Sequence, residues 1–222
     1  MCGRFTLAAE TADLEAEFEG VQFPTQFAPR YNIAPSQPVL VIPNEGKGRA
    51  DFFVWGLIPS WAKDASIGSR LINARGETLA EKPAFRGAYK YKRCLILADG
   101  FYEWKSIPHT KVKVPHYITL AERKAFGFAG LWSEWHASDG SEVRSCTIVT
   151  TTPNSLLAGI HNRMPVIISR EDRQLWLDPA PKSHADLTHL IRPYPAELMQ
   201  AFAVSTLVNS PANDRAECVL PA

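Results

Sequence analysis

The cysteine at position 2 has the clearest chemistry in this sequence. Initiator methionine is usually removed before a small residue, so the mature chain is expected to begin with Cys2, which carries an amine and a thiol on adjacent carbons. Their reference pKa values, about 7.7–8.0 and about 8.5, leave both groups partly nucleophilic near neutral pH. The amine could capture an aldehyde as an imine, which the thiol would close to a thiazolidine. Alternatively, the thiol could attack an amide or ester, or Cys2 could simply belong to an N-terminal strand.

Three other side chains could transfer protons or orient a reactant. Glu103 lies between Tyr102 and Trp104 after an apolar run, where loss of solvation would raise its pKa towards neutrality. His161 lies between an apolar segment and a proline-anchored strand, a rigid position for an acid–base group. Asn73, in a tight loop, could orient an amine or a hydroxyl. The ordinary alternatives are an ion-paired glutamate, a histidine bonded to a backbone carbonyl and an asparagine that caps a turn.

Positive charge is concentrated in one part of the chain. The net charge is +1, but residues 70–113 contain ten Lys and Arg against four Asp and Glu, which gives +6 there and −5 elsewhere. A basic face on a nearly neutral protein indicates an acidic partner such as nucleic acid, although many charge runs are only solvated. Arg4, Arg75 and Arg163 could bind phosphates, and Trp61 could stack on an unpaired base. Salt bridges and core packing are the alternatives for these residues.

Composition limits the class of protein. A chain of 222 residues that is 45% hydrophobic can form one sizeable core, so we expect a single domain over residues 1–222. The four cysteines form no CxxC pair and no histidine has zinc-ligand spacing, so we expect neither a metal nor a cofactor. Free cysteines fit a reducing compartment. Without a signal peptide or an apolar run near about 18 residues, we expect a cytoplasmic, nucleoid-associated protein that does not contact membranes. The sequence does not constrain the oligomeric state, for which we take a monomer as the default.

The pattern of apolar segments predicts the fold class. Short strands separated by turns dominate, helices lie between them, and no βαβ rhythm is visible, which indicates an α+β fold built on an antiparallel, barrel-like sheet. We expect an ordered loop over residues 23–38. Strands are expected at residues 39–43, 51–57, 116–120, 125–132, 143–151, 164–168 and 201–204. Helices are expected at residues 6–18, 77–82, 85–90, 155–160, 170–177 and 184–191.

Six short motifs follow one another along the chain. They are MCGRF at residues 1–5, RYNIAP at 30–35, WGLIP at 55–59, NARGET at 73–78, DGFYEW at 99–104 and HNRMP at 161–165. This set resembles the motifs of the SOS response-associated peptidase (SRAP) family and has the family's order. It extends from residue 1 to about residue 168. Six matched motifs in order make the resemblance highly specific.

The resemblance implies a function. Family members recognise abasic sites in single-stranded DNA and crosslink to them through the N-terminal cysteine, so Cys2 would capture the aldehyde of the ring-opened sugar as a thiazolidine that shields the lesion from cleavage. It implies that Asn73 lies near the Cys2 amine and that Glu103 assists ring opening and imine formation. His161 would be a second proton-transfer group, acting on the sugar hydroxyl and in crosslink reversal. Family positions that line the DNA cleft are matched by Arg4, Asn32, Trp61, Arg75 and Arg163.

The peptidase label implies that the protein removes its own Met1, although an aminopeptidase would also expose Cys2. While Met1 remains attached, the Cys2 nitrogen is an amide and cannot form an imine. An imine without ring closure would permit β-elimination and hence some lyase activity. Two positions depart from the pattern: Ala62 follows Trp61 where some members have a second tryptophan, and Pro83 stands where members can carry an arginine.

Two other classes of function remain open. An N-terminal-cysteine amidohydrolase or peptidase acting in trans would need an oxyanion hole near the thiol, and it would leave the basic segment unexplained. A non-covalent reader of modified bases would keep its affinity when Cys2 is replaced and would not prefer an abasic site.

Overall fold

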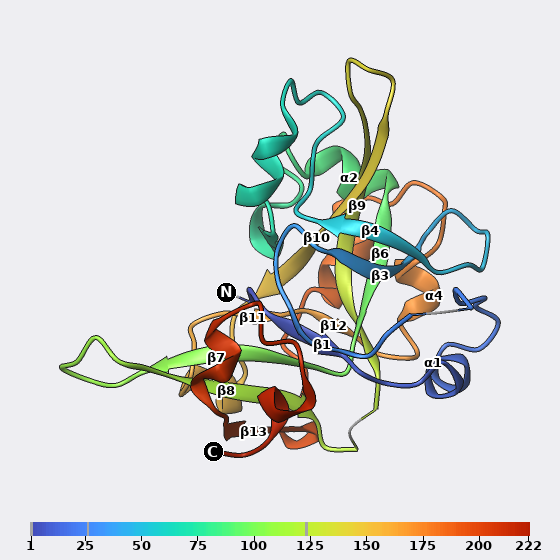
Figure 1. Ribbon diagram of the computed structural model, residues 1–222. Helices are drawn as coiled ribbons and strands as arrows, with labels where there is room; N and C mark the ends of the chain where they lie inside the picture. The colour runs from blue at the N-terminus through green and yellow to red at the C-terminus, as the bar shows by residue number, and fades with distance from the viewer. Residues whose placement is uncertain (1, 26, 123) are drawn as a thin grey trace.

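Five strands close into a barrel at the centre of the computed structural model (Figure 1). The barrel strands are β3 (Pro38–Pro43), β4 (Asp51–Trp55), β6 (Arg93–Ala98), β9 (Phe126–His136) and β10 (Glu142–Thr151). β3 pairs with β4 and β6, and β9 pairs with β6 and β10, all antiparallel. A parallel pairing of β10 with β4 closes the ring. The structure describes residues 2–25, 27–122 and 124–222.

A second sheet holds the N-terminal strand. Its order is β13 (Met199–Ala203), β8 (Lys113–Leu120), β7 (Gly100–Ser106), β1 (Phe5–Leu7) and β2 (Arg30–Ile33). The short strands β5 (Asn73–Arg75), β11 (Met164–Pro165) and β12 (Ile167–Ile168) pair with the barrel. The α-helices are α1 (Thr11–Glu17), α2 (Arg86–Tyr91), α3 (Ser155–Ala158), α4 (Arg173–Trp176) and α5 (His184–Leu187). The 3₁₀ helices are Ala65–Arg70, Gly76–Thr78, Thr188–Leu190, Ala196–Leu198, Thr206–Asn209 and Ala216–Val219.

Aromatic packing fixes the N-terminal segment against the barrel. The Phe5 ring meets Trp55 edge-on with centroids 5.0 Å apart, and it meets Phe128 at 5.7 Å. All three side chains are buried, and such aromatic pairs add about 0.5–1.5 kcal/mol each to the burial of their area. The Trp55 indole N–H also donates to the Ile72 carbonyl at 2.8 Å. The same core residues therefore hold both the chain end and the segment that leads into β5.

The predicted α+β class with a barrel-like sheet is confirmed, and most predicted strands are present. The antiparallel description needs one correction, because β10 pairs in parallel with both β4 and β5. The helix expected at residues 6–18 is wrong at its start: Phe5–Leu7 form β1 between β2 and β7, and only Thr11–Glu17 are helical. Pairing with two neighbouring strands overrides the local helical pattern.

Other boundaries also differ from the sequence prediction. Part of the loop expected at residues 23–38 forms β2, and residue 26 of that loop lies outside the described residues. Only a 3₁₀ turn, Gly76–Thr78, stands where residues 77–82 were expected to be helical. The helices predicted at residues 155–160 and 170–177 shorten to α3 and α4. No helix in the described ranges has the length and apolar composition needed to cross a bilayer.

A close backbone contact shapes the loop after β4. Gly56 has a φ of +131°, and a Cβ on it would lie 2.7 Å from the Gly68 carbonyl oxygen. A Cβ on Gly68 would meet the Gly56 carbonyl oxygen at the same distance. Only glycine fits at both positions. This contact holds together the two ends of the loop between Gly56 and Gly68, which contains Trp61.

Candidate active site

Cys2 lies three residues before the start of β1 and is fully buried. Its thiol donates a long hydrogen bond, 3.7 Å, to the Arg4 carbonyl oxygen. The Asn73 amide donates from Nδ2 to the Cys2 carbonyl oxygen at 2.8 Å. The backbone of Cys2 is thus held from β5, a strand about 70 residues away in the sequence.

The side chain of Asn73 has a second, unused polar atom. β5 pairs in parallel with β10, with Asn73 opposite Ile148, and this pairing fixes the position of the Asn73 backbone. Its Oδ1 is buried and accepts no hydrogen bond from the described residues. Buried acceptors without a partner are rare in proteins and require an explanation. An amine or hydroxyl of a bound reactant would satisfy this oxygen.

Glu103 and His161 face each other beside this segment. Glu103 comes from β7 and is only 2% exposed, and its Oε2 lies 3.9 Å from His161 Nε2. His161 Nδ1 has two backbone neighbours in Arg163, the N–H at 3.1 Å and the carbonyl oxygen at 3.3 Å. The shorter contact is the hydrogen bond that the Arg163 N–H donates. With Nδ1 as acceptor, the proton of the neutral imidazole is on Nε2, which faces the carboxyl group.

Burial tunes the acid–base properties of the pair. It raises the pKa of Glu103 to about 7, and it lowers the pKa of His161 below its usual value of 6.5. Burial, reinforced by the charge of Glu103, also raises the pKa of the Cys2 thiol. The site therefore combines a protonated thiol, a neutral histidine and a carboxyl group that exchanges its proton near pH 7, which suits proton transfer to a reacting group.

Of the predicted DNA-binding residues, two are open to solvent. Trp61 is 59% exposed, and Arg75, at the end of β5, is also exposed. Arg163 is occupied: its guanidinium forms a fork with the two Glu77 carboxylate oxygens at 2.6 and 2.9 Å, and it also donates to the Thr150 carbonyl at 2.7 Å. A phosphate would have to compete with Glu77 for this arginine.

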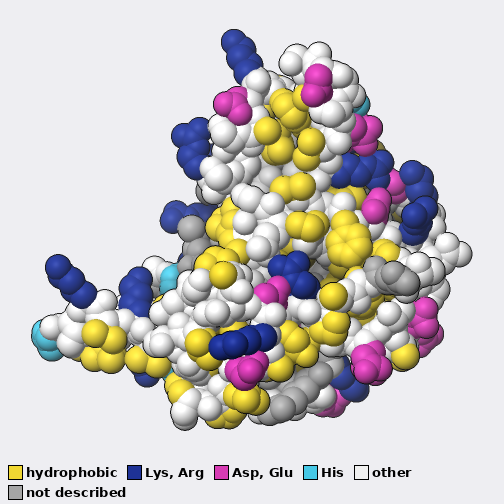
Figure 2. Space-filling view, viewed as in Figure 1, with side chains coloured by type: hydrophobic (Ala, Val, Ile, Leu, Met, Phe, Trp, Pro, Cys, Tyr) yellow, Lys and Arg dark blue, Asp and Glu magenta, His cyan; other side chains and the backbone are white. Residues whose placement is uncertain are grey.

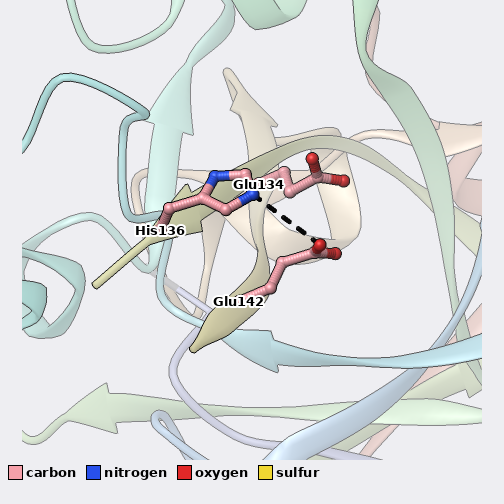
Figure 3. A group of neighbouring side chains, drawn as sticks. All are labelled: Glu134, His136 and Glu142. Carbon is pink, nitrogen blue, oxygen red and sulfur yellow. Dashed lines mark ion pairs between the residues drawn. The ribbon is translucent and has the colours of Figure 1, made fainter. Parts of the chain in front are cut away.

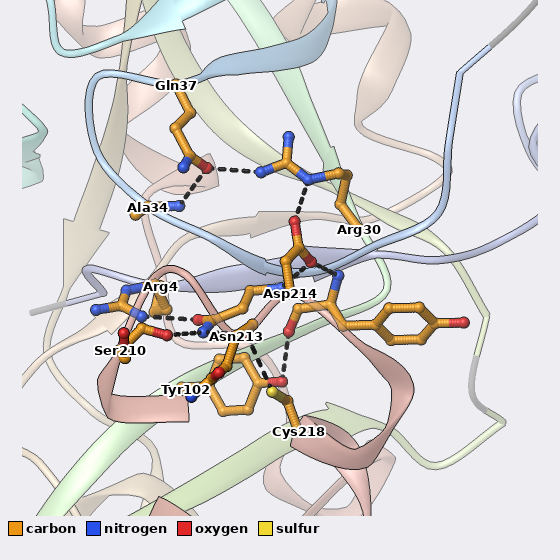
Figure 4. Close-up of polar contacts among 11 residues, drawn as sticks. Arg4, Arg30, Ala34, Gln37, Tyr102, Ser210, Asn213, Asp214 and Cys218 are labelled. Atoms are coloured by element: carbon orange, nitrogen blue, oxygen red, sulfur yellow. Dashed lines mark hydrogen bonds and ion pairs between the residues drawn. The ribbon is translucent and has the colours of Figure 1, made fainter. Parts of the chain in front are cut away.

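Arg4 belongs to a second polar cluster (Figure 4), and its guanidinium bonds to Asn32, which belongs to the same cluster. The Asn32 side chain is fully buried. Its Nδ2 donates to the carbonyls of Val208, Ser210 and Asn213, and its Oδ1 accepts from Arg4 Nη1 at 2.7 Å. In this structure Asn32 therefore has no surface to offer DNA, and it holds Arg4 in place.

Asp214 completes this C-terminal hub, which we define as Arg4, Asn32, Asp214 and the carbonyls that Asn32 binds. Its carboxylate accepts from the Asn32 backbone N–H at 2.9 Å and pairs with Arg30 (Figure 4). The hub fastens the segment around residues 206–214 to β2. No local sequence signal indicated Asp214, because its partners lie more than 180 residues away.

One predicted contributor to the basic face is a core residue. Arg93 is fully buried, and its guanidinium donates to the carbonyls of Tyr89, Lys90, Trp176, Asp178 and Ala180. It joins α2 and the segment after α4 to the barrel. Its charge is therefore not available to an external partner.

Glu134, His136 and Glu142 form a group on the β9–β10 hairpin, with possible ligand atoms within 4.8 Å of one another (Figure 3). Arg144 lies beside it and bonds to Glu134 at 3.4 Å and to Glu142 at 3.3 Å. The guanidinium supplies the positive charge that these carboxylates require. We therefore interpret the group as an ion-pair network.

The fold and the site define an α+β barrel protein with an N-terminal cysteine beside a glutamate–histidine pair. The family model "SOS response associated peptidase (SRAP)" matches residues 1–211, and the chain belongs to this family. The abasic site processing protein YoqW of Bacillus subtilis is 47% identical over 222 residues, covering 99% of both chains. The abasic site processing protein HMCES of Gallus gallus is 32% identical, covering 88% of this chain and 67% of its own.

A solved structure supports the fold independently. The crystal structure of a protein from Bacteroides thetaiotaomicron superposes with a TM-score of 0.89 at 28% identity, covering 100% of both chains. The predicted family is confirmed by the match of its model to residues 1–211, and the barrel with its second sheet is the architecture that this chain shares with the solved structure.

Proposed function

We propose that this protein captures abasic sites in single-stranded DNA as a covalent crosslink to Cys2. The observation that carries the proposal is the grouping of Cys2 and Asn73 with a Glu103–His161 pair whose pKa values lie near or below neutrality. The names of the relatives, abasic site processing proteins, point to the same substrate. The crosslink would shield the lesion from strand cleavage.

The chemistry follows from these groups. After Met1 is removed, by the protein itself or by an aminopeptidase, the Cys2 amine attacks the aldehyde carbon of the ring-opened sugar. One amine proton passes to the aldehyde oxygen as the carbinolamine forms, and Glu103 donates a second proton to this oxygen, so that water leaves. The iminium nitrogen then gives its remaining proton to the Glu103 carboxylate, which leaves the neutral imine. The thiol sulfur then adds to the imine carbon and its proton passes to the nitrogen, which closes the thiazolidine.

Asn73 and His161 have supporting roles in this proposal. The open Oδ1 of Asn73 accepts a hydrogen bond from the attacking amine or from a sugar hydroxyl and thereby orients it. His161 moves a proton to or from the sugar hydroxyl during ring opening and during crosslink reversal. An imine that does not close would allow β-elimination, which gives the protein a minor lyase activity.

For the DNA itself, Trp61 and Arg75 offer a stacking face and a phosphate contact, because both are exposed. Arg163 would bind DNA after exchanging Glu77 for a phosphate. Arg4 and Asn32 would act indirectly, by fastening the segment around residues 206–214 to β2. We expect the protein to work as a monomer on nucleoid DNA, without a cofactor.

Denaturing gel electrophoresis tests the proposal. Purified protein is mixed with single-stranded DNA that contains one abasic site, and intact mass confirms the loss of Met1. A shifted band that requires both Cys2 and the abasic site is the expected result, and the matched variant Cys146→Ser should keep it, since Cys146 is buried in the barrel strand β10. If processed protein gives no shifted band, the proposal fails. Amide hydrolysis in trans, or binding that survives loss of Cys2, would then identify one of the alternatives.

A further inference from the structure

The hairpin that joins β7 and β8 projects from the body of the protein (Figure 1). We call residues 105–113 the basic arm. All nine residues are exposed. Two strands that leave the sheet without covering any other element add little to the core. Such a projection is therefore a candidate for contact with a partner.

The charge of the arm has a single sign. It carries Lys105, Lys111 and Lys113, and no Asp or Glu occurs from residue 104 to residue 121. None of the three lysines forms an ion pair with any residue in the described ranges. Figure 2 shows dark blue side chains, which are lysines in this segment, and a cyan histidine on this projection. The arm thus presents positive charge that the protein itself does not neutralise.

The arm is a direct continuation of the active site. Glu103 is on β7, two residues before Lys105. A strand rises about 3.3 Å per residue, so the arm extends from close to the carboxyl group to roughly 20 Å beyond it. Lys113 pairs with Ser106 across the hairpin, and its charge lowers the pKa of Glu103 against the larger, opposite effect of burial. A strand bound at Glu103 would pass along these lysines.

Two apolar side chains lie between the lysines. Ile107 and Val112 are 40% and 57% exposed, and they face each other across the turn, where the Ile107 N–H donates to the Val112 carbonyl at 3.1 Å. Apolar surface next to lysines suits single-stranded DNA, because its bases and sugars are accessible beside the phosphates. A fully paired duplex would present mainly phosphates to such a surface.

We propose that the basic arm binds the single strand that flanks the abasic site on one side of the reacting sugar. The lysines contact phosphates, and Ile107 and Val112 contact a base or a sugar. This inference rests on the proposed function for the position of the strand. The arm thereby extends the footprint of the protein by several nucleotides without contributing to the chemistry.

The test compares two variants with the same loss of charge. In Lys105→Gln/Lys111→Gln the arm loses two lysines. In the control, Lys47→Gln/Lys124→Gln, two lysines are lost that lie outside the arm and pair with Glu45 and Glu122. Crosslinking rates are measured on an abasic strand with long flanks and on strands truncated on the 5′ or the 3′ side. We expect the arm variant to lower the ratio of long-substrate to short-substrate rates for one flank only, and the control to keep the wild-type ratio.

Salt dependence makes the test quantitative. Each phosphate contact with a single strand contributes about 0.7 to the slope of log affinity against log salt, so losing two contacts should reduce the slope by about 1.4. Equilibrium binding of undamaged single-stranded DNA, measured in the Cys2→Ser background, gives this slope without crosslinking. A third variant, Ile107→Ser/Val112→Ser, should weaken binding several-fold at an unchanged slope.

The outcomes separate the two proposals. Equal slopes and equal rate ratios for the arm variant and the control would overturn the role of the arm, even if crosslinking is robust. A reduced slope without any crosslinking would support the arm and refute the proposed function. If only a purified protein partner, and not DNA, distinguishes the arm variant from the control, the arm is a protein-binding surface and the inference is wrong.

Discussion

Two buried polar clusters lie beside the N-terminal strand, and they differ in how completely their hydrogen bonds are made. In the C-terminal hub, the Asn32 side chain bonds to Arg4 and to three carbonyls. In the candidate active site, by contrast, Asn73 Oδ1 remains open and Glu103 has a pKa raised to about 7. Both clusters contain residues that the family motifs identify. Under the proposed function, the hub stabilises the fold, whereas the open acceptor and the carboxyl group of the site interact with a reactant.

The physical reason is the cost of burial. A buried polar group with complete partners contributes to stability, whereas one with an open acceptor or a desolvated carboxyl group costs free energy until something binds. Perturbed pKa values cluster at functional sites for this reason. The comparison therefore predicts that substitutions in the hub change stability and that substitutions in the site change reactivity.

The largest expected effect is the loss of crosslinking in Cys2→Ala, which is compared with a substitution of Cys218. Cys2→Ala should abolish crosslinking to an abasic strand, while the free energy of unfolding falls by no more than about 1–2 kcal/mol. The counterpart Cys218→Ala removes the thiol that donates to the Asn213 carbonyl at the edge of the hub, and it should leave crosslinking intact. Gel-shift and denaturant-unfolding measurements on both variants test this. Crosslinking by Cys2→Ala would remove the nucleophile from the proposed mechanism.

Glu103→Gln should slow crosslinking by about 10²–10⁴-fold, the usual contribution of a general acid or base. The pKa of about 7 at Glu103 means that the acid form is lost as pH rises through neutrality. The wild-type rate of imine formation should therefore decline above about pH 7, and this step in the pH–rate profile should be absent from the variant. Single-turnover rates from pH 5 to about pH 9 provide the measurement. An unchanged profile in Glu103→Gln would mean that another group supplies the proton.

Asn32→Ala should lower the free energy of unfolding by about 2–4 kcal/mol, because it removes the buried hydrogen bonds from Asn32 Nδ2 to three carbonyls and the bond from Arg4 to Asn32 Oδ1. Urea unfolding measures the loss. Crosslinking under conditions where the variant remains folded should be reduced far less than in Glu103→Gln. A stable variant that no longer captures DNA would instead show that Asn32 meets the substrate.

The smallest expected effect is on the pH dependence of stability. The pKa of Glu103 is raised from 4.5 to about 7 on folding, so its contribution to stability is fully present below about pH 4.5 and is lost as pH rises through about 7. Glu103→Gln should flatten this part of the stability curve, by about 2–3 kcal/mol across the window. Urea midpoints at pH 4.5 and about pH 8 would reveal it. Parallel curves for the wild type and the variant would show that burial does not perturb this carboxyl group.

Local sequence was sufficient to predict those strands whose apolar pattern lies within one short segment. The strands β3 and β4 were predicted at residues 39–43 and 51–57 from their apolar pattern. The helix expected at residues 6–18 was wrong at its start because strand pairing, not propensity, decides Phe5–Leu7. Arg93 was assigned to a basic face, and its burial follows from carbonyls that α2 and the segment after α4 bring to it.

The sequence by itself determined the family, the candidate nucleophile and the types of residue available for proton transfer, because contiguous motifs encode these. Only the tertiary structure decided which polar residues are reactive. Burial, hydrogen-bond partners and pKa depend on segments far apart in the chain: Asn73 reaches Cys2 across 71 residues, and Asn32 reaches Asn213 across 181. A motif identifies a side chain, but the surroundings of that side chain in the folded protein set the free energy of its charged form and hence its pKa.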